Sequence, residues 1–312
     1  MNHSFILGDA VSKWTTADMP DLTGRVAVIT GANTGLGFET ATALAERGAE
    51  VVLACRDQGK AKAAADRIGR RVPGAVIDTV ELDLASLASV RVAAAAIGAR
   101  HDRVDLLINN AGVTGLSGTT EDGFEVQFGV NHLGHFALTG LLLDRITAAD
   151  AARVVTVSSI GHRFGRIDPD DPAAPIGNAY GKSKLANLLF TYELDRRLAD
   201  TSAVALAAHP GGASTEVFRY SPAAFRLPNL AIARLFGRTP AMGALPTLRA
   251  ATDPSAAGSE YYGPSGLFGI QGYPERVRSS SDSRDRHRQG RLWEVSERLT
   301  GVQYPARALK VD

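Results

Sequence analysis

The chain has 312 residues, of which 45% are hydrophobic and 21% charged, so it is long and apolar enough for one large globular domain. Its net charge of +1 gives no electrostatic reason to expect a nucleic-acid partner. The single cysteine, Cys55, excludes an internal disulfide and suits a reducing compartment. The apolar run Phe5–Leu7 is too short for a signal peptide or a membrane span. We therefore expect a cytoplasmic protein with no integral membrane segment.

Residues 1–20 are expected to form an N-terminal arm held by Trp14, and residues 21–312 to form one domain. Within that domain, short apolar runs alternate with longer segments of helical spacing. The runs expected as strands are 25–30, 51–54, 76–82, 104–108, 154–157 and 204–207. Because these runs are mainly apolar or β-branched, both faces of the sheet should be buried, as in parallel sheets. The predicted fold class is α/β: a single doubly wound Rossmann-type domain with a parallel sheet of about seven strands and helices on both faces.

The first predicted strand runs directly into a glycine loop, Thr30–Gly37, which precedes a helical segment. Glycines in such a loop allow bare backbone to approach a pyrophosphate at the helix N-terminus. The spacing, Gly-x-x-x-Gly-x-Gly, is weak evidence as a string, and a tight turn with close helix–sheet packing would explain it equally. Between a strand and a helix, however, it indicates dinucleotide binding.

Tyr180 and Lys184 are four residues apart, so on a helix their side chains would share one face. A lysine beside a tyrosine favours the phenolate and lowers the pKa of the phenol. Such a tyrosine could exchange a proton near neutral pH. The spacing is also common on ordinary amphipathic helices, so it needs support from the rest of the chain.

Several motifs occur in an order that resembles the short-chain dehydrogenase/reductase family, over residues 22 to about 302. They are the loop Thr30–Gly37, the motif Asn109–Gly112, Asn131, Ser159, the pair Tyr180 and Lys184, and the segment Pro210–Gly211 with Thr215. The segments Asn131–Phe136, Ser183–Asn187 and Leu292–Ser296 resemble the retinol dehydrogenase-like branch of that family.

The resemblance implies a catalytic set of Asn131, Ser159, Tyr180 and Lys184. Tyr180 would be the general acid and base, and Lys184 would lower its pKa and hold the nicotinamide ribose. Ser159 would donate to the developing oxyanion, although a serine there could simply cap a turn. Asn131 would kink its helix and hold a water that links Lys184 to solvent, although a helical asparagine is more often a local hydrogen-bonding residue.

The cofactor residues that the resemblance implies come from six segments. They are Gly31, Asn33, Thr34, Gly35, Leu36, Gly37, Arg56, Asp83, Leu84, Asn110, Ala111, Gly112, Tyr180, Lys184, Pro210, Gly211 and Thr215. Cys55 stands where NAD-specific relatives place an acid, and Arg56 follows it, so we predict NADP. NAD is the alternative, because Asp57 could serve a ribose. Asp83 would bond the adenine amine, or it could cap the next helix.

The apolar stretch 214–242 is predicted to be a substrate lid; packing on the body, a subunit interface or membrane contact are the alternatives. His132 and His135 lack further ligands at metal-binding spacing, so no metal is expected. The apolar helix face at 185–192 could be core or the interface of a homo-oligomer. We predict an NADP(H)-dependent oxidoreductase that interconverts a carbonyl and an alcohol on a lipophilic small molecule. An idle dinucleotide-binding sensor or scaffold, or an enzyme that reduces a C=C bond, are the alternatives.

Overall fold

The computed structural model describes residues 13–168, 170–174, 176–213, 239–266 and 269–304. The predicted cofactor residue Thr215 lies outside these ranges, as does the predicted lid except for residues 239–242. Among the residues within them, no helix combines the length and the apolar character needed to cross a bilayer.

The strands of the described residues form one sheet of eight, in the order β3-β2-β1-β4-β5-β6-β7-β8. Their bounds are β1 Val26–Thr30, β2 Glu50–Cys55, β3 Ile77–Glu81, β4 Leu106–Asn109, β5 Arg153–Val157, β6 Val204–Ala208, β7 Tyr261–Pro264 and β8 Pro274–Arg276. The six runs predicted as strands are β1 to β6. The strand β8 pairs antiparallel with β7, so the sheet is parallel only as far as β7. The expectation of about seven strands was close, and the doubly wound order is confirmed.

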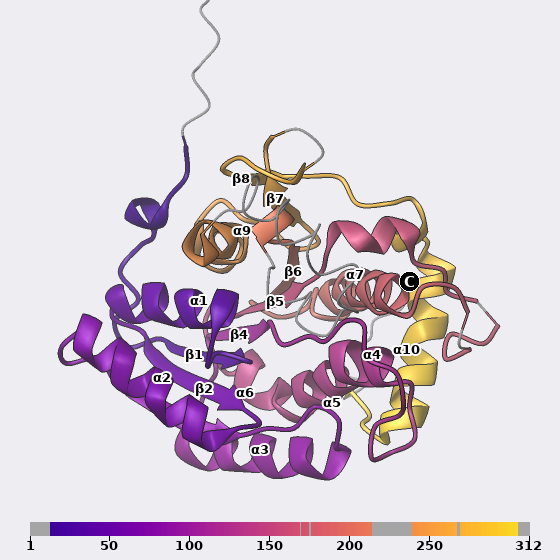
Figure 1. Cartoon of the computed structure of the whole chain (residues 1–312), viewed down its shortest axis with the longest axis horizontal. Coiled ribbons are helices and arrows are strands. Elements are labelled where there is room, and N and C mark those ends of the chain that lie inside the picture. Colours follow the sequence, from indigo (N-terminus) through magenta and orange to yellow (C-terminus); the bar gives the residue numbers. More distant parts are fainter. Residues whose placement is uncertain (1–12, 169, 175, 214–238, 267–268, 305–312) are drawn as a thin grey trace, which may run out of the picture.

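Helices cover both faces of the sheet (Figure 1). The α-helices are α1 Gly35–Glu46, α2 Gln58–Arg71, α3 Leu87–Arg100, α4 Val126–Phe128, α5 Gly134–Leu141, α6 Leu143–Thr147, α7 Ala179–Arg197, α9 Pro240–Thr252 and α10 Arg286–Thr300. Polar side chains start many of them: Asp57 caps α2, Asn178 caps α7 and Asp285 caps α10. Gly301, with φ of +63°, ends α10 in the left-handed conformation that favours glycine.

Consecutive residues of β1 point into two separate cores, as a doubly covered sheet requires. Val28 belongs to the core that includes Phe136 of α5 and Trp293 of α10. Ile29 belongs to the opposite core, with Leu44 of α1. Trp14, only 7% exposed, also packs in this second core, so the described part of the N-terminal arm is held against the body. The face of α7 at 185–192 is buried within the chain itself.

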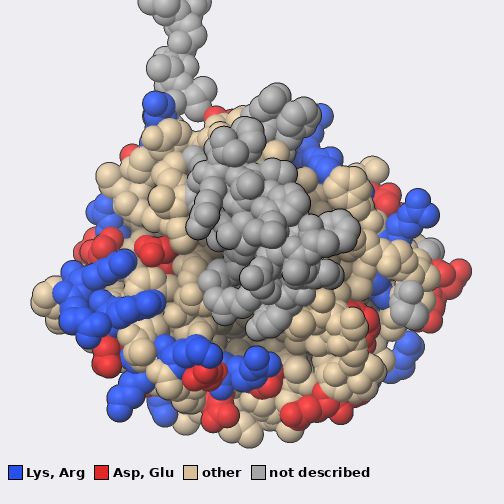
Figure 2. Space-filling view, viewed as in Figure 1, with Lys and Arg blue, Asp and Glu red and all other residues tan. Residues whose placement is uncertain are grey.

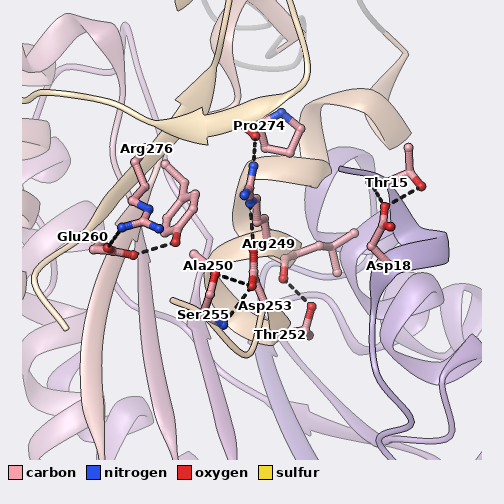
Figure 3. A network of polar contacts seen from close by, with 12 residues as sticks. Thr15, Asp18, Arg249, Ala250, Thr252, Asp253, Ser255, Glu260, Pro274 and Arg276 are labelled. Carbon is pink, nitrogen blue, oxygen red and sulfur yellow. Dashed lines mark hydrogen bonds and ion pairs between the residues drawn. The ribbon is translucent and has the colours of Figure 1, made fainter. Parts of the chain in front are cut away.

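A polar network anchors α9, the helix that follows the predicted lid, to the far edge of the sheet (Figure 3). The Arg249 side chain donates to the Asp253 carboxylate at 2.9 Å and to the Pro274 carbonyl of β8 at 2.5 Å. Arg153 of β5 donates to the carbonyl of Asp253 at 2.9 Å. The C-terminal end of α9 is therefore held by both β5 and β8.

Candidate active site

The carboxyl ends of β1, β2 and β4 open on a cleft of ≈ 650 Å³. Twelve of the predicted cofactor residues line it: Gly31, Asn33, Thr34, Gly35, Leu36, Gly37, Arg56, Asp83, Leu84, Asn110, Ala111 and Gly112. The structure therefore brings together residues from four separate segments of the chain. Tyr180, Lys184, Pro210 and Gly211 are predicted cofactor residues that do not line this cleft.

The glycine loop forms a bare cradle at the N-terminus of α1. Gly31 and Gly35 have φ of +66° and +57°, which favour glycine. A methyl group on Gly37 would lie 2.6 Å from both the Gly31 carbonyl oxygen and Asn110 Nδ2. Thr34, at the N-cap of α1, makes no side-chain hydrogen bond to the first turn. The first backbone N–H groups of α1 therefore suit an anion such as a pyrophosphate, and this cradle fits a dinucleotide.

Thr30 closes the loop against the motif Asn109–Gly112. Its hydroxyl accepts from the backbone N–H groups of Asn110 and Ala111, at 2.9 Å each, and its carbonyl accepts from Asn110 Nδ2 at 2.8 Å. A methyl group on Gly112 would lie 3.3 Å from both Asn131 Oδ1 and Lys184 Nζ. The wall of the cofactor cleft is thus also the wall of the predicted catalytic set.

Ser159 follows β5 and caps a 3₁₀ helix, Ile160–Phe164, by accepting from the N–H of Gly161 at 3.1 Å. The turn-capping interpretation is therefore correct as local structure, but the same hydroxyl also reaches Tyr180. Burial raises the pKa of Tyr180, and the hydrogen bond with Ser159 partly opposes this. The neighbouring Ser158 has a different role, because its hydroxyl donates to the Lys184 carbonyl at 2.8 Å and ties α7 to β5.

The Lys184 ammonium is buried and donates to the carbonyl of Val157 at 3.0 Å. Burial lowers the pKa of Lys184 from 10.5 to about 8. Its Nζ lies 5.8 Å from the centroid of the Tyr180 ring. The net direction in this structure is opposite to the predicted one, because the pKa of Tyr180 is raised and not lowered. The ammonium is directed to a backbone carbonyl, and loss of hydration dominates the environment of the phenol.

Asn131 lies in a π-helical turn, Gly129–Leu133, immediately before α5. Bends in helices often occur at such turns, so this departure from α-helical geometry is consistent with the predicted kink. Its side chain accepts from the N–H of Val113 at 2.7 Å, and donates to the Val113 carbonyl and to Ser183 Oγ, both at 2.9 Å. Asn131 is therefore not a local hydrogen-bonding residue: it joins the cleft wall to α7.

His132 and His135 are buried close together, and three of their four ring nitrogens contact protein groups. His132 Nδ1 has no hydrogen-bond partner among the described residues. His132 Nε2 lies 2.9 Å from Ser296 Oγ of α10, and burial lowers the pKa of His132 to about 3. His135 contacts Thr30 and the Asn131 carbonyl. Within the described ranges, no cluster of three or more His, Cys, Asp or Glu side chains could hold a metal ion.

Charged residues surround the end of the cleft at β2. Asp57 accepts from the N–H of Lys60 at 2.9 Å and pairs with Lys60 Nζ at 2.7 Å, and the hydrogen bond from Lys60 lowers the pKa of Asp57. Asp83 accepts from the N–H of Ala85 at 2.9 Å, so it does stabilise the turn before α3. Lys60 and Arg67 also line the cleft, and the sequence analysis missed both. Their spacing of seven residues on a helix could have indicated a shared face.

Basic side chains gather on the side of the molecule where α2 lies (Figure 2). Arg67 packs over the ring of Phe38, with its Cζ 4.0 Å from the centroid. The cleft therefore has a positively charged rim beside the cradle, which suits a ligand with more than one phosphate group.

Pro210 and Gly211 follow β6. Gly211 has φ of +67°, and a methyl group there would lie 2.5 Å from the Ile270 carbonyl oxygen. The next N–H, of Gly212, donates to that same carbonyl at 3.0 Å. Glycine is therefore required at this turn by both conformation and space, so the turn has a structural reason independent of any cofactor.

Comparisons with known proteins agree with this geometry. The model of the short chain dehydrogenase family matches residues 25–224. Human retinol dehydrogenase 13 is 40% identical over 96% of this chain and 92% of its own length. Mouse retinol dehydrogenase 12 is 41% identical over 90% of this chain and 88% of its own length. A crystal structure of an uncharacterised protein from Mycobacterium paratuberculosis is 42% identical, covers 94% of this chain and 100% of its own, and has a TM-score of 0.76.

Over most of its length, then, this chain belongs to the short-chain dehydrogenase family of oxidoreductases, and within that family it is similar to the retinol dehydrogenases.

Proposed function

We propose that the protein is an NADP(H)-dependent oxidoreductase that interconverts a carbonyl and an alcohol on a lipophilic small molecule. The observation that carries this proposal is the position of Gly112. It lines the cofactor cleft, and a methyl group on it would lie 3.3 Å from Lys184 Nζ. The glycine cradle and the proton-transfer residues therefore share one wall, as transfer of a hydride and a proton to the same carbonyl requires.

A bound nicotinamide supplies or accepts the hydride. The residues of the chain then manage the oxygen of the substrate. Ser159 Oγ donates to the carbonyl oxygen as negative charge develops on it. The Tyr180 phenol gives its proton to that oxygen in reduction, and its raised pKa keeps the proton on the phenol near neutral pH. In the reverse direction Tyr180 must first lose its own proton, and the phenolate oxygen then accepts the proton of the alcohol.

Lys184 and Asn131 act next to this pair. Lys184 is 3% exposed, and its Nζ lies 5.8 Å from the centroid of the Tyr180 ring. Burial keeps the pKa of the resting phenol raised, so the proposed role of the ammonium is to stabilise the phenolate only as it forms in oxidation. Asn131 holds the cleft wall at Val113 and the catalytic helix at Ser183 with one side chain. We assign Asn131 to fixing the distance between the cofactor cleft and α7.

The charges at the end of β2 support NADP over NAD. Arg56, Lys60 and Arg67 all line the cleft and could meet a 2′-phosphate. Asp57, the carboxylate that could serve a ribose in NAD, is occupied by capping α2 and by the ion pair with Lys60. A phosphate on the ribose would therefore meet positive charge without having to displace a free carboxylate.

A lipophilic substrate is supported by the relatives whose names specify retinol, and by the apolar composition of residues 214–242. We propose that the relevant substrates are apolar aldehydes, ketones and their alcohols. The specific substrate would then be selected by the size of its apolar part.

The test is NADPH oxidation by the full chain against aldehydes and ketones of increasing apolar size, retinal included, with the product identified. Tyr180→Phe should lower kcat about 10²- to 10⁴-fold and leave the affinity for NADPH nearly unchanged, because it removes the hydroxyl that exchanges the proton, from a residue that does not line the cofactor cleft. Full activity of Tyr180→Phe would contradict the mechanism. Tight NADPH binding without turnover of any substrate would favour the sensor or scaffold. A saturated C=C bond in the product would favour the third alternative.

A further inference from the structure

His135 is a buried histidine whose two ring nitrogens contact two different functional segments. The residue is 1% exposed, in the first turn of α5. Its Nδ1 lies 3.0 Å from the carbonyl oxygen of Asn131, in the π-helical turn. Its Nε2 lies 2.9 Å from Thr30 Oγ1, at the end of β1. The ring therefore bridges the loop that forms the cofactor cradle and the turn that carries Asn131.

The surrounding hydrogen bonds allow only one tautomer of this ring. Thr30 Oγ1 already accepts from the backbone N–H groups of Asn110 and Ala111, at 2.9 Å each, so both of its lone pairs are used. Its own hydrogen must be donated, and His135 Nε2 at 2.9 Å is nearer than the Ile108 carbonyl at 3.4 Å. Nε2 is then an acceptor, so Nδ1 carries the ring proton and donates to the Asn131 carbonyl, which can only accept.

We infer that His135, as the neutral Nδ1–H tautomer, is a positioning residue that fixes the Asn131 turn relative to the cofactor cradle. The inference rests on the proposed function, because that proposal assigns Asn131 to fixing the distance between the cofactor cleft and α7. In a π-helical turn the regular backbone hydrogen bonds between residues four apart are interrupted. Here the imidazole of His135 supplies a donor to the Asn131 carbonyl. The side chain of Asn131 is held at Val113 and Ser183, so the histidine adds the contact to its backbone.

The environment maintains the neutral ring. Burial is the main reason that the pKa of His135 is lowered from 6.5 to about 4, and the nearby Lys184 ammonium lowers it further. The hydrogen bond to the Asn131 carbonyl acts in the opposite direction. Lys184 also belongs to the proposed catalytic set. Its positive charge therefore helps to keep the ring of His135 neutral as well as serving the active site.

His132 offers a matched control. It lies three positions earlier, is also 1% exposed, and its Nε2 bonds Ser296 of α10, not the cofactor cradle. Replacing either ring should destabilise the fold by a similar amount, since both are buried with a hydrogen-bond partner. Only the loss of His135 should alter the position of Asn131.

The direct test is ¹⁵N NMR of the histidine side chains in the full chain, without turnover. We expect His135 to appear as the neutral Nδ1–H tautomer at neutral pH, and an Nε2–H tautomer would overturn the inference. Steady-state kinetics then compare His135→Leu, His135→Asn and His132→Leu. His135→Leu should lower kcat about 100-fold, since small displacements of reacting groups have effects of that size. His135→Asn, whose amide can still donate to the Asn131 carbonyl, should recover most of it.

His132→Leu should lower the melting temperature and leave kcat within about twofold of the wild type, because the ring that it removes contacts Ser296 of α10 and neither the Asn131 carbonyl nor the cofactor cradle. Equal losses of kcat in His135→Leu and His132→Leu would overturn the positioning role. Failure of the proposed function would look different. In that case Tyr180→Phe would be as active as the wild type, while the tautomer of His135 in the NMR spectrum would be as expected.

Discussion

Arg56 Nη1 lies 4.0 Å from Asp83 Oδ2, so the predicted phosphate-binding arginine and the predicted adenine-binding aspartate face each other at the cleft. The Arg56 side chain is 72% exposed, so this contact contributes little to stability. The guanidinium is therefore able to turn toward a 2′-phosphate without a large loss. This relationship makes cofactor preference a property that one substitution can test.

Arg56→Ala should raise the KM for NADPH about tenfold or more and leave the KM for NADH nearly unchanged, because a charge-assisted hydrogen bond to phosphate is lost. Steady-state kinetics with both cofactors measure this. Arg70→Ala is the matched control, since Arg70 is an exposed arginine of α2 that does not line the cleft. If the wild type prefers NADH and Arg56→Ala changes neither constant, the NADP assignment is wrong.

Lys184→Met should stabilise the fold at neutral pH by about 1 kcal/mol or more while abolishing turnover, because it removes a buried charge. The folded pKa of Lys184, about 8, lies below the ordinary value of 10.5, so the unfolded chain binds more protons between these values. The stability of the wild type should therefore gain from rising pH in that window, and the advantage of Lys184→Met should shrink there. Urea unfolding at neutral pH and near pH 10 measures both effects. An unchanged or lower stability of Lys184→Met at neutral pH would contradict this account.

Acid should destabilise the protein through its buried histidines. Burial lowers the pKa values of His132, His135 and His209 from 6.5 to about 3, 4 and 3. Above pH 6.5 each is neutral in both states; below it, the unfolded chain takes up protons that the folded chain does not. Each should reduce the free energy of unfolding by about 1.4 kcal/mol per pH unit between its unfolded and folded pKa values. In His132→Asn the free energy of unfolding should fall with decreasing pH by about 1.4 kcal/mol per pH unit less than in the wild type. Denaturant melts at several pH values measure this slope, and an unchanged slope would contradict the burial of a neutral His132 ring.

Two glycine substitutions should have opposite effects. In Gly37→Ala the new methyl group would lie 2.6 Å from the Gly31 carbonyl oxygen, so we expect a loss of about 1–3 kcal/mol and weaker NADPH binding. Gly69→Ala, in α2, meets nothing within 4 Å and should stabilise the fold by about 0.5–1 kcal/mol. Thermal melts and NADPH titration of both variants measure the contrast. Equal melting temperatures would mean that the cradle can relax.

The strands that the sequence predicted were those with a local signal. The apolar runs of β1, β2, β4, β5 and β6 follow from burial on both faces, which the two separate cores at Val28 and Ile29 demonstrate. The edge strand β3 contains Asp78 and Glu81 and is only partly buried. No such signal marks β7 and β8, because β7 contains Gly263 and ends at Pro264, and β8 is a polar segment of three residues. Their place in the sheet depends on pairing with β6 and on the α9 network, which act between distant parts of the chain.

The amino-acid order by itself determined the α/β class and the glycine loop of the cofactor cleft, because strand burial and glycine spacing are local properties. Lys60 and Arg67 line the same cleft without such a local signal. The tertiary structure decided the state of the ionisable groups of the site. It raised the pKa of Tyr180, directed Lys184 to the Val157 carbonyl, and selected one tautomer of His135 through Thr30. Protonation and hydrogen-bond partners depend on neighbours through space, and Thr30 and His135 are 105 positions apart in the chain.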